Sequence, residues 1–163
     1  GNARHGDRLR RWLNRSVRGD AAFLRLVASN ALQVLPPLGR IRDFVVDADG
    51  LIDLKKYGVR VFVDVARIFG LRMAVDASST AARLRQAGSR MGVSSEELAA
   101  IIDGFHFIQL LRLRAQNSKL EEGDPAGNRI DPEELNELDR RILKESFRQA
   151  RKLQLRLKLD YQL

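Results

Sequence analysis

The strongest constraint on the fold is a long run of apolar residues at helical spacing between residues 94 and 119. The apolar residues are closely spaced and are Leu98, Ile101, Ile102, Phe105, Phe107, Ile108, Leu110, Leu111 and Leu113. They occupy more than one side of the helix that they predict, so other elements must cover it. We therefore expect a central helix, opened by a capping box in which Ser94 or Ser95 precedes Glu97.

Two shorter segments before it also have helical periodicity and clear ends. In the first, Asp20 can cap a helix that Pro36-Pro37 ends, because proline cannot continue a helix. In the second, Ser78 or Ser79 can begin a helix that Gly92 ends. These signals predict helices on both sides of a less regular middle segment.

The C-terminal segment predicts the last long helix. Asp131-Pro132 offers a cap and a favourable first-turn proline. An apolar stripe follows at helical spacing and consists of Leu135, Leu138, Ile142, Phe147, Ala150, Leu153 and Leu157. Several helices that share one core predict an all-α fold, an antiparallel helical bundle.

The segment between Gly39 and Met73 is less regular. The apolar runs 41–46 and 51–54 flank Asp47-Ala48-Asp49-Gly50, which predicts a small β-hairpin inserted in the bundle. The residues from Val59 to Val65 alternate as in a strand, but the apolar positions also fit a helical face that continues to about Met73. We interpret 59–73 as a helix.

The composition excludes several classes of protein. Of the 163 residues, 44% are hydrophobic and 31% are charged, which is typical of globular proteins, and there is no cysteine. Disulfides, thiolate metal sites and cysteine nucleophiles are therefore excluded. No apolar run approaches the roughly 20 residues that span a bilayer, and the N-terminus is not a signal peptide, so we expect a cytoplasmic protein without a membrane partner.

No metal site is expected in this chain. The segment 47–53 resembles the middle of a calcium-binding EF-hand loop, but the first and last ligand positions would be Val45 and Lys56, neither of which supplies a carboxylate. His5 and His106 are too far apart for a helical zinc pair. Gly1-Asn2-Ala3 is typical of an artificial remnant, so we expect residues 1–19 to be a remnant and linker with a short helix, and 20–163 to be the domain.

Basic residues give the chain a formal net charge of +8, which favours an anionic partner. Lys56, Arg60, Asp64 and Arg67 follow one another at spacings of four, four and three, so they share one helix face. This face is either a solvated stripe with ion pairs to Asp64 or a cationic patch for a phosphate or an acidic partner.

A second polar face lies on the central helix, where Gln109, Arg112 and Gln116 share one side. Buried polar groups need hydrogen-bond partners, so these residues either form an interhelical network or line a cleft. In a cleft, Arg112 would be the best-placed cation for an anionic substrate.

Six separated blocks of the sequence together resemble a known bacterial family. The blocks are Pro36-Pro37-Leu38-Gly39, Ile52-Asp53-Leu54-Lys55, Asp64-Val65-Ala66-Arg67, Arg112-Leu113-Arg114-Ala115-Gln116, Asn128-Arg129-Ile130-Asp131-Pro132 and Leu143-Lys144-Glu145-Ser146-Phe147-Arg148. Their order and spacing resemble the putative nucleotidyltransferase substrate-binding domain over about residues 20–163. The resemblance implies a helical domain similar to the C-terminal bundle of kanamycin nucleotidyltransferase.

In that family the domain follows a nucleotidyltransferase domain like that of the uridylyltransferase of the signalling protein PII, often with cyclic-nucleotide-binding and CBS modules upstream. The resemblance therefore implies a non-catalytic substrate-binding or docking domain in bacterial signal transduction, inactive alone. The Gly-Ser or Gly-Gly turn with two metal-binding carboxylates is absent, so Mg²⁺ and a nucleoside triphosphate are expected only in the missing catalytic domain.

Chemistry alone suggests which residues contact the substrate, the nucleotide or the catalytic domain. The candidates are Lys55, Arg60, Arg67, Arg112 and Gln116. The expected partners are the protein's own nucleotidyltransferase domain and a nucleotide, an acidic protein or a small-molecule substrate; no catalytic residue is expected here.

Two alternative functions remain open. The first is a structural dimerisation or regulatory module, in which exposed apolar residues of the Leu135 to Leu157 stripe would form a homodimer. The second is an electrostatic nucleic-acid binder. We favour the second less, because only 6% of the residues are aromatic and no helix-turn-helix, RNA-binding or zinc-finger signature accompanies the charge.

Overall fold

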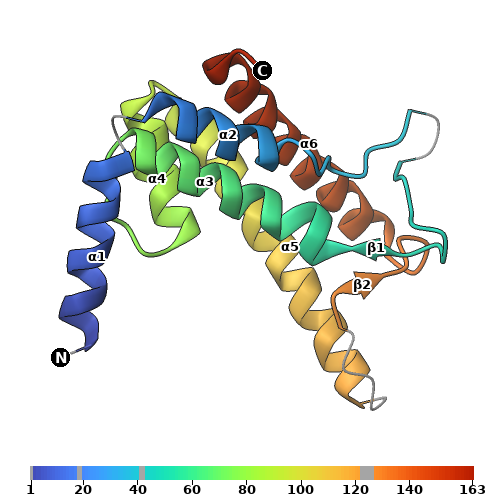
Figure 1. The fold of residues 1–163 in the computed structure, drawn as a ribbon. Helices are drawn as coiled ribbons and strands as arrows, with labels where there is room; N and C mark the ends of the chain where they lie inside the picture. The colour runs from blue at the N-terminus through green and yellow to red at the C-terminus, as the bar shows by residue number, and fades with distance from the viewer. Residues whose placement is uncertain (1, 18–19, 41–42, 122–126) are drawn as a thin grey trace.

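A computed structural model describes residues 2–17, 20–40, 43–121 and 127–163. The described chain is a helical bundle with one pair of very short strands (Figure 1). Its elements are α1 (Asn2–Val17), α2 (Ala21–Ala31), β1 (Ile52–Asp53), the π-helix η1 (Lys55–Val59), α3 (Arg60–Arg72), α4 (Thr80–Arg90), α5 (Ser95–Glu121), β2 (Arg129–Ile130) and α6 (Glu137–Tyr161). The all-α bundle with a small β element is confirmed. Among the described helices, none is long and apolar enough to cross a membrane.

Three predicted helix starts are confirmed by their caps. The Asp20 carboxylate accepts a hydrogen bond from the Phe23 amide at 2.9 Å, and the Ser79 side chain accepts one from the Ala82 amide at 3.2 Å. The Ser94 hydroxyl accepts the amide of Glu97, also at 3.2 Å, at the start of α5. Each cap satisfies a backbone donor that the first helical turn leaves without a partner.

The predicted start of α6 is wrong. Asp131 does not cap the helix; its side chain accepts the Glu133 amide at 2.8 Å in a turn directly after β2. The cap is Asn136, which accepts the Asp139 amide at 2.8 Å. Both residue types can cap a helix, but the chain at Asp131 has just left the strand and must turn before α6 can begin.

The predicted hairpin forms its turn but not its pairing. Gly50 has a φ of 81° and the Asp47 amide donates to the Leu51 carbonyl at 2.9 Å, as the Asp-Gly turn predicts. However, β1 pairs with β2, and Ile52 lies opposite Ile130. Residues 41 and 42 of the other predicted strand lie outside the described residues. Phe44 forms an isolated bridge with Leu38, and its ring is buried against Phe147 on α6.

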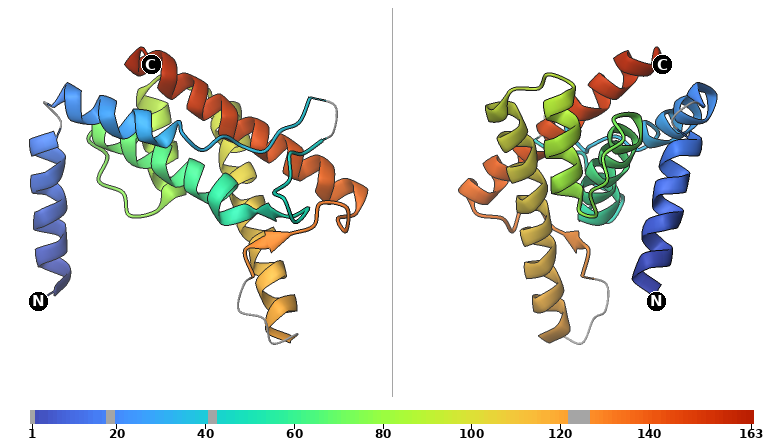
Figure 2. Two further views of the ribbon diagram at one scale, coloured as in Figure 1. Left: turned by 45° about the vertical axis from the view of Figure 1, so that its right-hand side comes forward. Right: turned by 90° about the vertical axis from the view of Figure 1, so that its left-hand side faces the viewer.

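The helix predicted over 59–73 is confirmed, and its helical backbone begins earlier, in η1. The central position predicted for α5 is also confirmed, since α5 and α6 cross with the most extensive contact between any two described elements (Figure 1). At the crossing, a Cβ on Gly104 would lie 3.2 Å from the Ser146 Cα, so glycine permits the close approach. The C-terminal part of α5 extends beyond the bundle, and α1 stands to one side of it (Figure 2).

Side chains from distant parts of the chain cap the C-terminal ends of several helices. Gln154 on α6 is 2% exposed, and its amide nitrogen donates to the Ala31 carbonyl at 3.1 Å and the Val34 carbonyl at 2.6 Å after α2. Arg90 donates to the Met73 carbonyl at 2.6 Å after α3. These contacts satisfy carbonyls that have no partner within their own helices.

We predict that Gln154→Leu lowers the free energy of unfolding by about 1–3 kcal/mol, because two carbonyls lose their buried donor. The substitution also removes the amide oxygen of Gln154, which is buried without a hydrogen-bond partner, and this removal offsets part of the cost. Urea denaturation measures the change. The matched control is Gln86→Leu on the exposed side of α4, which should change stability by no more than about 0.5 kcal/mol. Equal stability of the two variants would contradict the prediction.

Candidate functional site

Three of the five predicted contact residues lie in one surface depression of about 550 Å³ on η1 and α3. The three are Lys55, Arg60 and Arg67, and Lys56 joins them. We call this site, with its four cations, the basic depression. Arg67 also borders an adjoining, largely apolar cleft of about 400 Å³ between α1 and α3. The basic depression therefore continues at one end into apolar surface.

The local backbone explains why the cations point outward. The Asp53 carboxylate accepts the Lys56 amide at 2.8 Å and so begins η1, whose i to i+5 pairing makes a wide turn. On the inner side of this turn, Gly58 is buried so closely that a Cβ would lie 2.8 Å from the Ile108 side chain. With that side packed on the core, Lys55 and Lys56 are exposed.

The four cations differ in their partners. Arg60 pairs with Asp64 at 3.4 Å, as the solvated-stripe interpretation predicts. Lys56 donates to the Tyr57 hydroxyl at 3.1 Å, and this hydrogen bond raises the pKa of Lys56 above its usual 10.5. Within the described residues, the side chains of Lys55 and Arg67 have no hydrogen-bond or ion-pair partner. These two exposed charges are available to a ligand.

The other two predicted contacts, Arg112 and Gln116, lie outside the basic depression. Arg112 donates to the side-chain oxygen of Asn128 and to that of Gln109 at 3.3 Å, and Gln116 donates to Asn128 at 3.4 Å. The Asn128 carbonyl in turn accepts the Leu54 amide at 2.8 Å. This network holds the chain before β2 against α5, so the polar face of α5 has a structural role. That Arg112 and Gln116 also contact a ligand stays a prediction.

Sequence reasoning missed Arg129, which organises the turn beside the basic depression. Its guanidinium pairs with Asp47 at 3.1 Å and Asp49 at 2.8 Å, and the Tyr57 hydroxyl donates to Asp47 at 2.8 Å. About 80 residues separate Arg129 from these carboxylates in the chain, so no local spacing could reveal the pairing. Among the described residues, no group of three histidine, aspartate or glutamate side chains is placed to hold a metal ion.

A comparison with known protein families covers the bundle from α2 to α6. A sequence model of the family described as putative nucleotidyltransferase substrate binding domain matches residues 21–161. The chain belongs to this family. The matched range runs from α2 to α6 and contains the basic depression and the Asn128 network, whereas α1 precedes it. No curated protein and no solved structure matches the chain.

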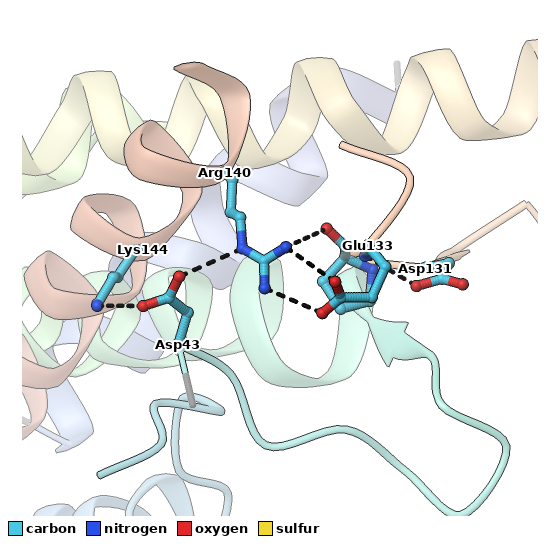
Figure 3. A network of polar contacts seen from close by, with 6 residues as sticks. Asp43, Asp131, Glu133, Arg140 and Lys144 are labelled. Carbon is cyan, nitrogen blue, oxygen red and sulfur yellow. Dashed lines mark hydrogen bonds and ion pairs between the residues drawn. The ribbon is translucent and has the colours of Figure 1, made fainter. Parts of the chain in front are cut away.

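A second polar cluster fixes α6 of this substrate-binding domain to the segment that follows α2 (Figure 3). Asp43 accepts hydrogen bonds from Lys144 and, at 3.2 Å, from Arg140, which also pairs with Glu133 at 3.0 Å. The hydrogen bond from Lys144 lowers the pKa of Asp43 below its usual 3.8, and the charges of Lys144 and Arg140 add to this effect. These two α6 cations therefore bind within the domain.

We predict that Asp43→Asn lowers the melting temperature of the substrate-binding domain at neutral pH and that the difference from the wild type shrinks in acid. Because folding lowers the pKa of Asp43, the stability from its charge is fully present above about pH 4 and is lost as the pH falls through the folded-state pKa. Thermal denaturation between roughly pH 2 and 7 measures the effect.

The control is Asp103→Asn, which alters an exposed carboxylate on α5. Its melting temperature should stay close to that of the wild type over the same pH range. A constant difference between Asp43→Asn and the wild type down to the lowest pH would contradict the assigned ionic contact.

Proposed function

We propose that this substrate-binding domain is a non-catalytic module of a multidomain nucleotidyltransferase and that its basic depression holds an anionic group of the substrate or nucleotide. The observation that carries the proposal is the presence of two exposed, unpartnered cations, Lys55 and Arg67, beside Lys56 and Arg60. Phosphate and carboxylate oxygens share the chemistry that such a site recognises.

The charge balance of the basic depression supports an anionic ligand. Its four cations face only two carboxylates, Asp53 and Asp64. Asp53 accepts the Lys56 amide and Asp64 pairs with Arg60, so both carboxylates already have partners. A phosphate or carboxylate that entered would therefore meet donors from Lys55 and Arg67 without displacing an internal ion pair.

The rigidity of the support also favours binding. The residues on the inner side of η1 and α3, among them Gly58, Phe62 and Val65, are buried in the core. The cations thus stand on backbone that folding has already ordered, so little backbone entropy would be lost on binding. Arg67 can also present two parallel donors to one anion, as planar guanidinium groups do.

The chemical step belongs, in this proposal, to a separate nucleotidyltransferase domain that supplies the metal-binding carboxylates, Mg²⁺ and the nucleoside triphosphate. The acidic pair that most resembles a metal site here, Asp47 and Asp49, is engaged by Arg129. We propose a uridylyl- or adenylyltransferase-like parent protein in bacterial signal transduction, with that catalytic domain as the partner of this one.

We predict that UTP, ATP or inorganic triphosphate raises the melting temperature of this domain and that added salt weakens the effect. A ligand at 100 times its dissociation constant should stabilise the fold by about 2.7 kcal/mol. Lys55→Glu and Arg67→Glu should each weaken binding about tenfold or more, because each replaces an attraction by a repulsion. Isothermal titration calorimetry measures the affinities.

Arg85→Glu is the matched control, since it makes the same charge change on α4 beside α5, on another surface. It should bind like the wild type. A poly-glutamate peptide, titrated in parallel, distinguishes a carboxylate partner from a phosphate. If none of the four probes binds, or if Lys55→Glu and Arg67→Glu bind as well as Arg85→Glu, the basic depression is not an anion site.

A further inference from the structure

A second exposed surface, made of apolar side chains, lies along α5 and α6. Its residues are Leu110, exposed to 42%, Leu113 to 57%, Leu138 to 65% and Ile142 to 37%. We call these four residues the apolar seam. These residues belong to the two longest helices and are exposed, so no described part of the domain covers them.

Contacts between the two helices place two of these residues, Leu110 and Ile142, near each other. α5 and α6 run in opposite directions, since Arg114 pairs with Asp139 at 3.2 Å and Gly104 lies against Ser146. Leu110 lies one turn before Arg114 on α5, and Ile142 lies between Asp139 and Ser146 on the same side of α6. Leu110 and Ile142 therefore flank the same stretch of the crossing between α5 and α6.

A charged stripe on α6 borders the apolar seam. It consists of Glu137, Arg141, Glu145 and Arg148, at spacings of four, four and three, and all four side chains are exposed. Within the helix, Glu137 and Arg141 approach only to 4.0 Å, and Glu145 and Arg148 to 3.4 Å. Glu145 also accepts a hydrogen bond from the Gln149 amide at 2.7 Å. Exposed ion pairs of this kind contribute little, so the charges of the stripe remain available to a partner.

The alternation of sign along the stripe has a specific consequence. If a second copy of α6 is laid antiparallel on the first, acidic and basic positions exchange places. Pairing centred near Leu143 sets Arg141 opposite Glu145 of the other copy and brings Glu137 within one residue of the position opposite Arg148. Every charge of the stripe then meets its opposite, which is the self-complementarity that a two-fold interface requires.

We propose that the apolar seam and the charged stripe together form a two-fold homodimer interface. Two copies of the seam cover each other, and the two stripes pair antiparallel beside them. The proposal uses a surface separate from the basic depression and does not depend on the proposed anion site. It also gives a function to the residues of the apolar seam near the start of α6, which are exposed rather than packed in the core.

Sedimentation velocity over a range of protein concentrations tests the proposal. The wild type is expected to dimerise, and Leu138→Glu is expected to raise the dissociation constant about tenfold or more, because it places an unpaired charge in the apolar seam. The control is Leu26→Glu, at an equally exposed leucine on α2, which should dimerise like the wild type.

A charge-swap series tests the pairing itself. Arg141→Glu and Glu145→Arg should each weaken the dimer, since each sets like charges opposite one another across the two-fold axis. The double variant restores opposite charges at both positions and should recover the wild-type dissociation constant to within about threefold. Circular dichroism confirms that each variant is folded.

Three outcomes would overturn the proposal. A wild type that stays monomeric at all concentrations would show that the apolar seam does not join two copies of the domain. A dimer that Leu138→Glu leaves intact would use another face. A double variant no tighter than the two single variants would show that the stripes do not pair in the antiparallel register.

Discussion

Helix ends leave backbone carbonyls without partners in their own helix, and burying such an end costs free energy unless another group donates to it. In this domain α6 supplies several of the donors. Gln154 reaches the carbonyls after α2, and Arg156 donates to the Met91 carbonyl at 2.9 Å after α4. Asp160 pairs with Arg72 at the end of α3 at 2.7 Å. The bundle therefore depends on α6 for polar contacts as much as for apolar burial.

The sequence predicts those features that neighbouring residues determine. Helical periods and the caps at Asp20, Ser79 and Ser94 depend on residues within one or two turns, and the structure confirms them. The pairing of β1 with β2 joins segments almost 80 residues apart, so the hairpin prediction found the turn but chose the wrong partner. The start of α6 was misplaced because Asp131 and Asn136 have similar capping chemistry, and only the path of the chain after β2 selects one of them.

The difference between local features and contacts of distant segments also applies to the candidate site. Lys56, Arg60 and Arg67 come together because they belong to one nearly continuous helical segment, so their spacing was informative. Arg112 and Gln116 also share a face, but their common partner, Asn128, belongs to a segment that folds back on α5. The periodicity of a sequence can show that a helix has a polar face. It cannot show which distant residue forms hydrogen bonds with that face.

The wide turn of η1 links the orientation of the basic depression to strand pairing. A π-helical turn holds one more residue between its bonded groups than an α-helical turn does, so the segment before it is rotated relative to a regular helix. In this chain β1 lies just before that turn, Lys55 is its first residue, and α3 follows it. The additional residue therefore determines how far α3 is rotated about its axis relative to β1. A relative with a regular α-helical turn at this position would need a different β1 register to present a cation beside Arg60.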